Sequence, residues 1–177
     1  VTGDNAATTV ATTVAGTADS LAFNVTAVGT ANSAAATLAS NASAVSLATS
    51  GYETIAVTSA GTAANLINLN TAVGAATITA SGTALTIADV AAATTAIDGS
   101  AMTGALTLSA ATAGTGALTS IKGGTGDDTF NVVATDLNAF AAIDGGAGDD
   151  TLSLSGTTVT MAPTITLVEN IDVTSLL

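Results

Sequence analysis

One ten-residue segment occurs twice in this chain, and it constrains the fold more than any other feature. The copies run from Ile121 to Phe130 and from Ile143 to Leu152, so they begin 22 residues apart. Each copy contains Gly-Gly-x-Gly-Asp-Asp-Thr followed by a large apolar residue. Glycine adopts backbone angles that are closed to other residues, so the segment predicts a tight turn. The apolar residue that follows predicts the start of a strand that enters the core.

Alternation of apolar and small polar residues indicates strands through most of the chain. From Ile55 onward a new alternating segment starts roughly every 9–13 residues, and Gly, Asn, Asp or Ser separates the segments. Short strands at such spacing predict either a β-sandwich or a β-solenoid. The sequence similarity between segments favours the solenoid, and the 2% aromatic content suits a narrow core of small side chains. We therefore expect an all-β fold, a parallel β-helix or β-solenoid.

Four other stretches depart from this alternation. Two Ala-rich stretches, residues 89–95 and 135–142, predict short helices. Residues 1–20 and 29–44 are low in complexity and rich in Ala, Thr and Ser. We expect irregular strands or loops in these two stretches.

The composition of the chain changes near residue 96, because few acids precede this point and both glycine turns follow it. We therefore divide the chain into an Ala/Thr-rich solenoid segment, residues 1–96, and a calcium-binding solenoid segment, residues 97–177. Both belong to one continuous elongated module, which we expect to be a fragment of a larger protein.

The only two Glu residues, Glu53 and Glu169, lie in similar segments. Each segment reads apolar-Glu-x-Ile-x-Val-Thr-Ser. We expect both side chains to cap or hydrogen-bond an edge of the solenoid, with a calcium role left open for Glu169.

The charge of the chain excludes several functions. Among 177 residues there is one Lys or Arg against 13 Asp and Glu, a net charge of -12. Nucleic acid is not expected as a partner, because phosphate binding needs basic residues. No apolar run approaches the roughly 20 residues of a membrane helix, so no membrane insertion is expected. The chain has no Cys, no His and no nucleophile-and-base motif, so we expect no enzyme.

Acidic residues gather in the two glycine turns and beside them. They are Asp127, Asp128, Asp144, Asp149 and Asp150. These carboxylates would repel one another without a cation. Ca²⁺ takes 6–8 oxygen ligands, and a glycine turn brings backbone carbonyl oxygens next to carboxylates. A plain β-turn explains one Gly-Asp-Asp segment, but two matching copies favour calcium.

The repeated segment resembles the haemolysin-type calcium-binding repeat of RTX proteins, Gly-Gly-x-Gly-x-Asp-x-U-x with U large and apolar. The resemblance implies a parallel β-helix whose Ca²⁺ ligands come from stacked turns. Carried over to this chain, the candidate metal ligands are Gly123, Thr125, Asp127, Asp128, Gly145, Gly146, Ala147, Gly148, Asp149 and Asp150. Regular RTX arrays place stacked turns about 18 residues apart. The excess here predicts a bulge, or a short helix between Asp136 and Ala142.

The Ala/Thr-rich composition and the Glu-x-Ile-x-Val-Thr segments are similar to those of type I-secreted bacterial surface-layer (S-layer) proteins. This resemblance implies a structural protein, secreted to the bacterial cell surface, that needs calcium to fold and to assemble with copies of itself into a lattice. Other parts of the full protein would bind cell-surface polysaccharide. Three alternatives remain: a spacer or binding module of an RTX adhesin, the calcium domain of an RTX enzyme, and an ice-binding protein. The last is suggested by Thr77-Ile78-Thr79.

Overall fold

The structure is a computed structural model of the chain. It describes residues 2–3, 10–15, 22–27, 32–40, 45–111, 113–156 and 162–173. Within these residues the regular structure is β-strand throughout, apart from one 3₁₀ turn, η1 (Ala134–Asp136).

The strands form two sheets, which we name sheet A and sheet B. Sheet A contains, in spatial order, β1 (Thr2–Gly3), β3 (Ala22–Ala27), β5 (Val45–Ser50), β7 (Asn65–Asn68), β10 (Leu85–Asp89), β12 (Leu106–Ala111), β14 (Thr129–Val133), β16 (Thr151–Ser155) and β18 (Asn170–Val173), and β8 (Ala72–Val73) also pairs with β5. Sheet B contains β17 (Thr164–Thr166), β15 (Leu137–Asp144), β13 (Leu118–Lys122), β11 (Ala96–Met102), β9 (Thr77–Gly82), β6 (Thr54–Ala60), β4 (Ser33–Ala39) and β2 (Val10–Ala15).

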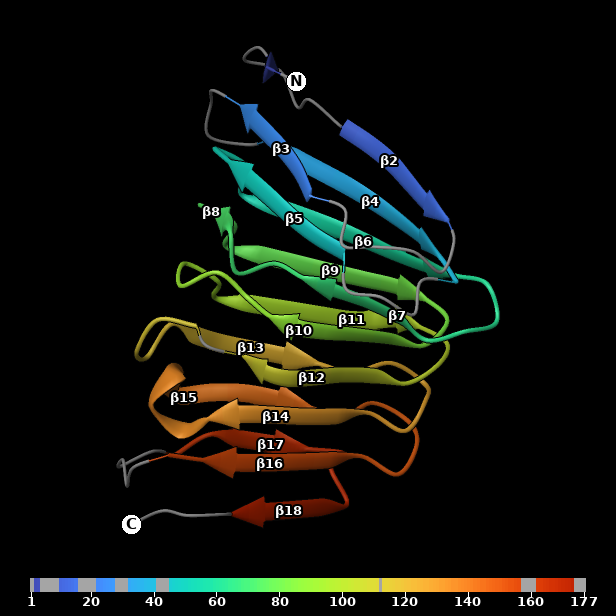
Figure 1. Cartoon of the computed structure of the whole chain (residues 1–177). Helices are drawn as coiled ribbons and strands as arrows, with labels where there is room; N and C mark the ends of the chain where they lie inside the picture. Colours follow the sequence, from blue (N-terminus) through green and yellow to red (C-terminus); the bar gives the residue numbers. More distant parts are fainter. Residues whose placement is uncertain are drawn as a thin grey trace.

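The chain passes from one sheet to the other and back, so each coil contributes a strand to both sheets. Figure 1 shows the coils stacked from the N-terminus at one end to the C-terminus at the other. Every strand pairing among the described residues is parallel. Parallel pairing of this kind confirms the predicted all-β solenoid, whereas the β-sandwich alternative requires antiparallel sheets.

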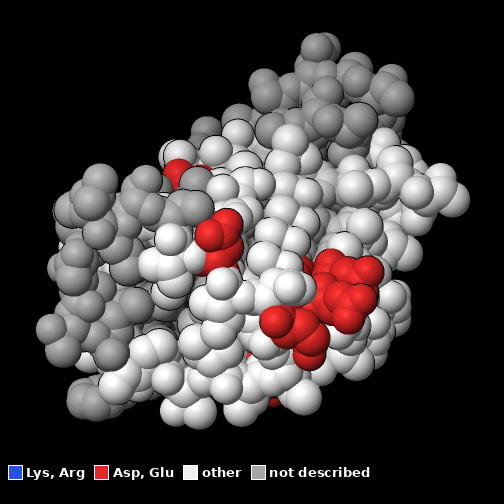
Figure 2. Space-filling model, turned by 90° about the horizontal axis from the view of Figure 1, so that it is seen from below, with Lys and Arg blue, Asp and Glu red and all other residues white. Residues whose placement is uncertain are grey.

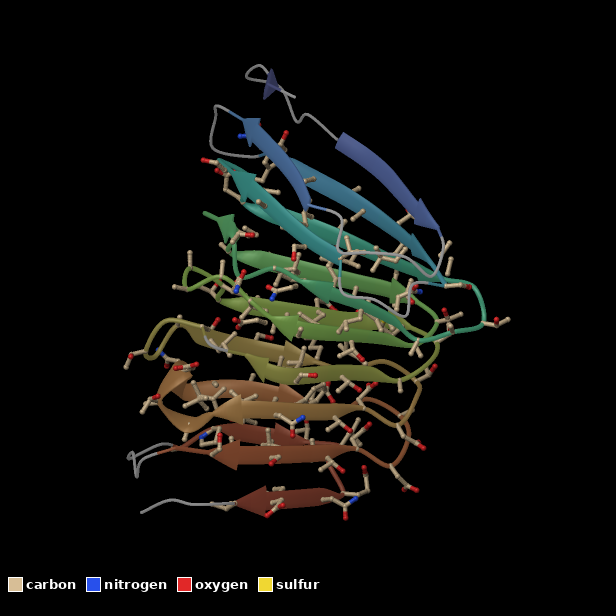
Figure 3. All side chains as sticks on the ribbon, in the orientation of Figure 1. Carbon is tan, nitrogen blue, oxygen red and sulfur yellow. The ribbon has the colours of Figure 1, made fainter. Side chains whose placement is uncertain are left out.

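Core-facing residues form continuous rows along both sheets. One row in sheet B consists of Ile55, Ile78, Ile97, Ile121, Ile143 and Ile165. The matching row in sheet A consists of Ile67, Ile87, Leu108, Phe130, Leu152 and Ile171. Most of these side chains are fully buried between the sheets, where burial stabilises each by about 1.5–3 kcal/mol. Figure 3 shows side chains as sticks on the coils from β4 to β18.

The last described coil is covered on one side only. Ile171 and Val173 of β18 occupy the same rows as Leu152 and Leu154 of β16. Leu152 is 0% exposed, whereas Ile171 is 53% exposed.

Both predicted helices are wrong. Residues 89–95 end β10 and form a turn, and residues 135–142 lie in η1 and in β15. Alanine has the highest helix propensity, but propensity is a weak determinant of structure and tertiary context overrides it. β15 pairs with β13 on one side and with β17 on the other.

The low-complexity stretches are more regular than predicted wherever the structure describes them. β2 and β4 pair over six consecutive residues without a register shift. Ala34, Ala36 and Leu38 of β4 are buried in the core. Small side chains therefore serve as core residues in these coils. The other residues of the stretches 1–20 and 29–44, apart from 2–3, 32 and 40, lie outside the described residues.

Candidate functional site

The two glycine turns lie at the same corner of adjacent coils. Residues 123–128 connect β13 to β14, and residues 145–150 connect β15 to β16. Ile121 pairs with Ile143 before the turns, and the Ala147 amide donates to the Gly124 carbonyl oxygen at 2.9 Å between them. The turns are therefore stacked directly on each other, and their separation of 22 residues is one full coil.

Within this coil, β15 contains a register shift against β13. Leu118 pairs with Leu137 and Ser120 pairs with Ala142, with a register shift between these pairs. A bulge of this kind was one of the two sequence predictions and is confirmed, whereas the alternative helix between Asp136 and Ala142 is wrong.

Glycine at the first turn position is required by close stacking. A methyl group on Gly123 would overlap the Gly145 carbonyl oxygen and the Asp128 carboxylate. A methyl group on Gly145 would overlap the Leu167 carbonyl oxygen of the next coil. These positions place backbone oxygens from one coil against the carboxylate of another.

The two turns differ in their backbone conformation although their sequences match. Gly146 has a φ of 100° and Gly148 a φ of 133°, both in the region that favours glycine. Gly124 and Gly126 of the first turn have no such positive φ. Their need for glycine comes instead from contacts with the preceding coil, such as the Gly126 position against the Ala105 amide nitrogen.

Asp128 of the first turn is saturated by backbone donors. Its side chain is 1% exposed. Oδ1 accepts the Leu106 amide of the preceding coil at 2.6 Å, and Oδ2 accepts the Gly124 amide of its own turn at 2.6 Å. Both carboxylate oxygens are therefore engaged in holding the corner together.

Asp150 of the second turn is satisfied at only one oxygen. Its side chain is 0% exposed, and Oδ1 accepts the Asp128 amide at 2.7 Å. Oδ2 is buried and has no hydrogen-bond partner. Leaving a charged oxygen buried without a partner costs about 1–3 kcal/mol or more.

A third acid continues the same pattern one coil further on. Glu169 Oε2 accepts the Asp150 amide at 2.8 Å, just as Asp150 and Asp128 accept amides of the coils before them. We call residues 123–128, 145–150 and 167–169 the acidic corner. The predicted capping role of Glu169 is confirmed by this bond. The same prediction for Glu53 is confirmed by its bond to the Asn32 amide at 2.6 Å.

Burial raises the pKa of the Asp128 and Asp150 carboxyls above the ordinary value of 3.8. Desolvation is the largest cause for both groups, because removal of water penalises the charged form. Their backbone hydrogen bonds oppose the shift, and neighbouring carboxylates add to it. For Asp150 these neighbours are Glu169, Asp127 and Asp149.

The predicted ligands separate into buried and exposed groups. Gly123, Asp128, Gly145 and Asp150 are buried, Gly146 is intermediate, and Thr125, Asp127, Ala147, Gly148 and Asp149 are exposed. Figure 2 shows acidic side chains gathered in a patch on the face seen from below. In the part of the chain that the structure describes, no three Asp or Glu side chains converge as a metal-binding group.

The only basic side chain of the chain lies beside this corner. Lys122 occupies a cross-strand row between Asp98 and Asp144 on sheet B. The pKa of Asp98 is lowered mainly by hydrogen bonds from Ser100 and further by the charge of Lys122. Lys122 therefore acts on Asp98, whereas Oδ1 of Asp144 in the same row is buried without a hydrogen-bond partner.

Sequence reasoning assigned no site role to Leu167, which the structure places at the acidic corner. The sequence does contain a signal for this third position, which is the spacing between the acidic residue and the next core residue. Asp128, Asp150 and Glu169 each stand two positions before an apolar residue of the same core row. That spacing identifies residues 167–169 as a third turn although they contain no glycine.

Comparison with protein-family models, curated proteins and solved structures found no match to this chain. No helix among the described residues is long and apolar enough to cross a membrane.

Proposed function

We propose that this chain is a calcium-dependent structural module of a secreted bacterial surface protein, and that it assembles with copies of itself into an S-layer lattice. The proposal combines the resemblance of the glycine turns to RTX calcium repeats with the chemistry of the acidic corner. It assigns no catalytic activity to the chain.

The buried, unpaired Oδ2 of Asp150 is the observation that carries the proposal. A protein interior tolerates such an atom when a cation or a donor completes its coordination. The chain has a single Lys or Arg, and Lys122 lies in the strand row of Asp98 and Asp144 on sheet B. A metal ion is the cation that fits this corner.

The donor set of the acidic corner suits Ca²⁺. Its available donors are carboxylate and backbone carbonyl oxygens, the hard ligands that Ca²⁺ prefers, and Ca²⁺ accepts irregular geometry. Asp150 would hold it through its unpaired Oδ2, together with carbonyl oxygens of the stacked turns such as those of Gly123 and Gly145. Asp128, whose two oxygens already accept backbone amides, would contribute its nearby negative charge. Bound calcium supplies positive charge that offsets the desolvation of these carboxylates.

Calcium binding at this corner makes folding depend on whether the chain is inside or outside the cell. Without a cation, the desolvation and mutual repulsion of these carboxylates offset part of the stabilisation that their hydrogen bonds give the stack. A ligand that binds only the folded state stabilises it in proportion to the logarithm of its concentration over Kd. Extracellular sites of this type have Kd values of about 10⁻⁴–10⁻³ M. The module would therefore fold outside the cell, where calcium is abundant.

The outer faces of the solenoid provide the surface for assembly. Polar residues form in-register rows there, such as Thr86, Thr107, Thr129 and Thr151 on sheet A. Repeated rows of this kind present the same chemistry along the stack, which suits contacts between copies of the chain. Cell-surface polysaccharide is the proposed partner of other parts of the full protein.

A calcium titration tests the proposed function. We expect Ca²⁺ added to chelator-treated protein to raise the melting temperature and the β-structure signal in circular dichroism, with an equal concentration of Mg²⁺ as the control. The double variant Asp128→Ala/Asp150→Ala should lose the response. A wild-type protein whose melting temperature and spectrum ignore Ca²⁺ would refute calcium-dependent folding.

Lattice formation is tested separately by electron microscopy of the protein with Ca²⁺ and with chelator. Ordered two-dimensional arrays that appear only with Ca²⁺ would support the S-layer assignment. Folded, calcium-bound protein that never forms arrays would favour the adhesin spacer. Thermal hysteresis would favour the ice-binding alternative, to which the Thr row of sheet A lends one supporting observation.

A further inference from the structure

The connection of residues 167–169 occupies the acidic corner without resembling a calcium repeat. Ile143 and Asp144 pair with Ile165 and Thr166 immediately before it, and Leu152 pairs with Ile171 after it. This connection therefore stacks on the second glycine turn as that turn stacks on the first.

Leu167 has an unusual backbone conformation that aims its carbonyl group at the second turn. Its φ is 50°, in the left-handed region that non-glycine residues rarely adopt. A methyl group on Gly145 would overlap the Leu167 carbonyl oxygen and lie 2.5 Å from Asp150 Oδ2. Two oxygen atoms from different coils thus face one small space, and neither a carbonyl nor a carboxylate can donate a proton to the other.

The unpaired oxygen distinguishes this level of the stack from the one before it. At the first turn, Asp128 Oδ2 faces the equivalent Gly145 carbonyl oxygen but accepts the Gly124 amide. At the second turn, Asp150 Oδ2 has no donor. The demand for a cation is therefore greatest between the second turn and residues 167–169.

We propose that the acidic corner binds a calcium ion between Asp150 and the Leu167–Glu169 connection, one level beyond the position that the two repeats predict. This inference rests on the proposed function. Asp150 Oδ2 and the Leu167 carbonyl oxygen are the first two ligands. The Glu169 carboxylate is held next to them by its bond to the Asp150 amide and supplies the second negative charge. Water completes the shell on the exposed side of Glu169.

Ca²⁺ fits this set better than Mg²⁺ does. Mg²⁺ demands near-ideal octahedral geometry and retains its waters, whereas Ca²⁺ accepts a flexible shell of carbonyl and carboxylate oxygens. A monovalent ion would neutralise one of the two carboxylates only.

The test compares two glutamates that make the same hydrogen bond at different corners. Glu169→Gln and Glu53→Gln each keep a side-chain oxygen for the amide bonded in the native protein, Asp150 N or Asn32 N. Calcium binding to the full chain is measured by isothermal titration calorimetry for the wild type and both variants. We expect Glu169→Gln to weaken the calcium affinity by about tenfold or more, and Glu53→Gln to leave it unchanged.

The outcomes separate this inference from the proposed function. If the wild type binds calcium and Glu169→Gln binds it with the same affinity, the inference is overturned and the proposed function stands. An equal loss of affinity in Glu169→Gln and Glu53→Gln has the same meaning. Wild-type protein that binds no calcium would remove both. Asp150→Asn gives a second check, since it keeps Oδ1 for the Asp128 amide. Its circular dichroism should match the wild type in calcium-free buffer, and a folded variant that still binds calcium with wild-type affinity would also overturn the inference.

Discussion

The first glycine turn, residues 123–128, and the second, residues 145–150, differ in sequence only at Thr125 and Ala147. Their structures differ in the hydrogen bonding of the buried carboxylate and in the backbone angles of the glycines. The first turn uses both oxygens of its buried Asp to bind backbone amides. The second leaves one oxygen of its buried Asp without a partner, and only the second contains positive-φ glycines.

The role of a repeat in a solenoid therefore depends on its neighbours. Each turn donates an amide to the coil that follows and accepts one from the coil that precedes. The first turn lies between the Leu106 coil and the second turn, whereas the second lies between the first and the Leu167–Glu169 connection. Equal sequences therefore meet unequal surroundings.

The largest expected effect tests whether the two turns are equivalent in the core. Phe130 and Leu152 follow the two turns, and both are 0% exposed. Truncation to alanine should lower the free energy of unfolding by about 3–5 kcal/mol for Phe130→Ala and about 2–5 kcal/mol for Leu152→Ala. Urea unfolding should give the same losses with and without calcium. A much smaller loss for Leu152→Ala would mean that the C-terminal coils contribute little to cooperative unfolding.

The next effect concerns the backbone of the second turn. Alanine at Gly146 combines a φ of 100° with overlap on the Gly124 carbonyl oxygen. Gly116 provides the matched control, because its φ is 66° and nothing lies within 4 Å of an added methyl group. Gly116→Ala should cost about 1–2 kcal/mol, and Gly146→Ala at least twice as much. Equal losses in thermal unfolding would show that stacking at Gly146 is looser than the structure indicates.

Isosteric amides separate the two buried carboxylates in calcium-free buffer. Asp128→Asn places an amide donor against a backbone donor and should cost about 1–3 kcal/mol. Asp150→Asn keeps Oδ1 on the Asp128 amide and offers a donor in place of the unpaired Oδ2. It also removes a buried charge, so its unfolding free energy should equal or exceed that of the wild type. Greater destabilisation by Asp150→Asn than by Asp128→Asn in chelator would contradict this assignment.

The smallest expected effect is the pH dependence of the calcium-free protein. The folded-state pKa values of Asp128 and Asp150 are raised by burial, so the folded state binds protons more tightly than the unfolded chain. Their contribution is fully present below the ordinary value near 3.8 and is lost as pH rises through the folded-state pKa values. Asp136 acts in the same direction, and Asp98, with a lowered pKa, opposes it.

Melting temperature measured from about pH 4 to pH 7 should therefore fall with rising pH in calcium-free buffer. With saturating calcium the trend should reverse over the same window, because protons compete with the metal for the carboxylates. A melting temperature that rises with pH in both buffers would mean that other groups dominate the linkage.

The fold was predictable because its determinants are local and repeated. Alternation around Ile78 or Leu108 indicates a strand with one buried face, and the similarity between segments indicates that such strands stack. The bulge predicted between the two turns corresponds to the register shift in β15. The helix predicted over residues 135–142 failed because alanine content describes a local preference, while the partners of β15 are distant in sequence.

The candidate site was predictable in its residues but not in its asymmetry. The buried Asp128 and Asp150 occupy the positions that the repeated segment indicates. The state of each carboxylate oxygen depends on which amide the adjacent coil presents, and the positions of these coils are set by register. The participation of Leu167 depends on a backbone angle for which its side chain gives no signal.

Three hydrogen bonds between backbone amides and carboxylates of the acidic corner share one direction along the chain. Leu106 donates to Asp128, Asp128 donates to Asp150, and Asp150 donates to Glu169. In these three bonds the acceptor comes later in the chain than the donor, so each amide reaches its carboxylate only when the next coil has been made. During synthesis from the N-terminus, the newest coil therefore has a corner amide that has not yet met its carboxylate acceptor. These three bonds then form in the order in which the coils are made.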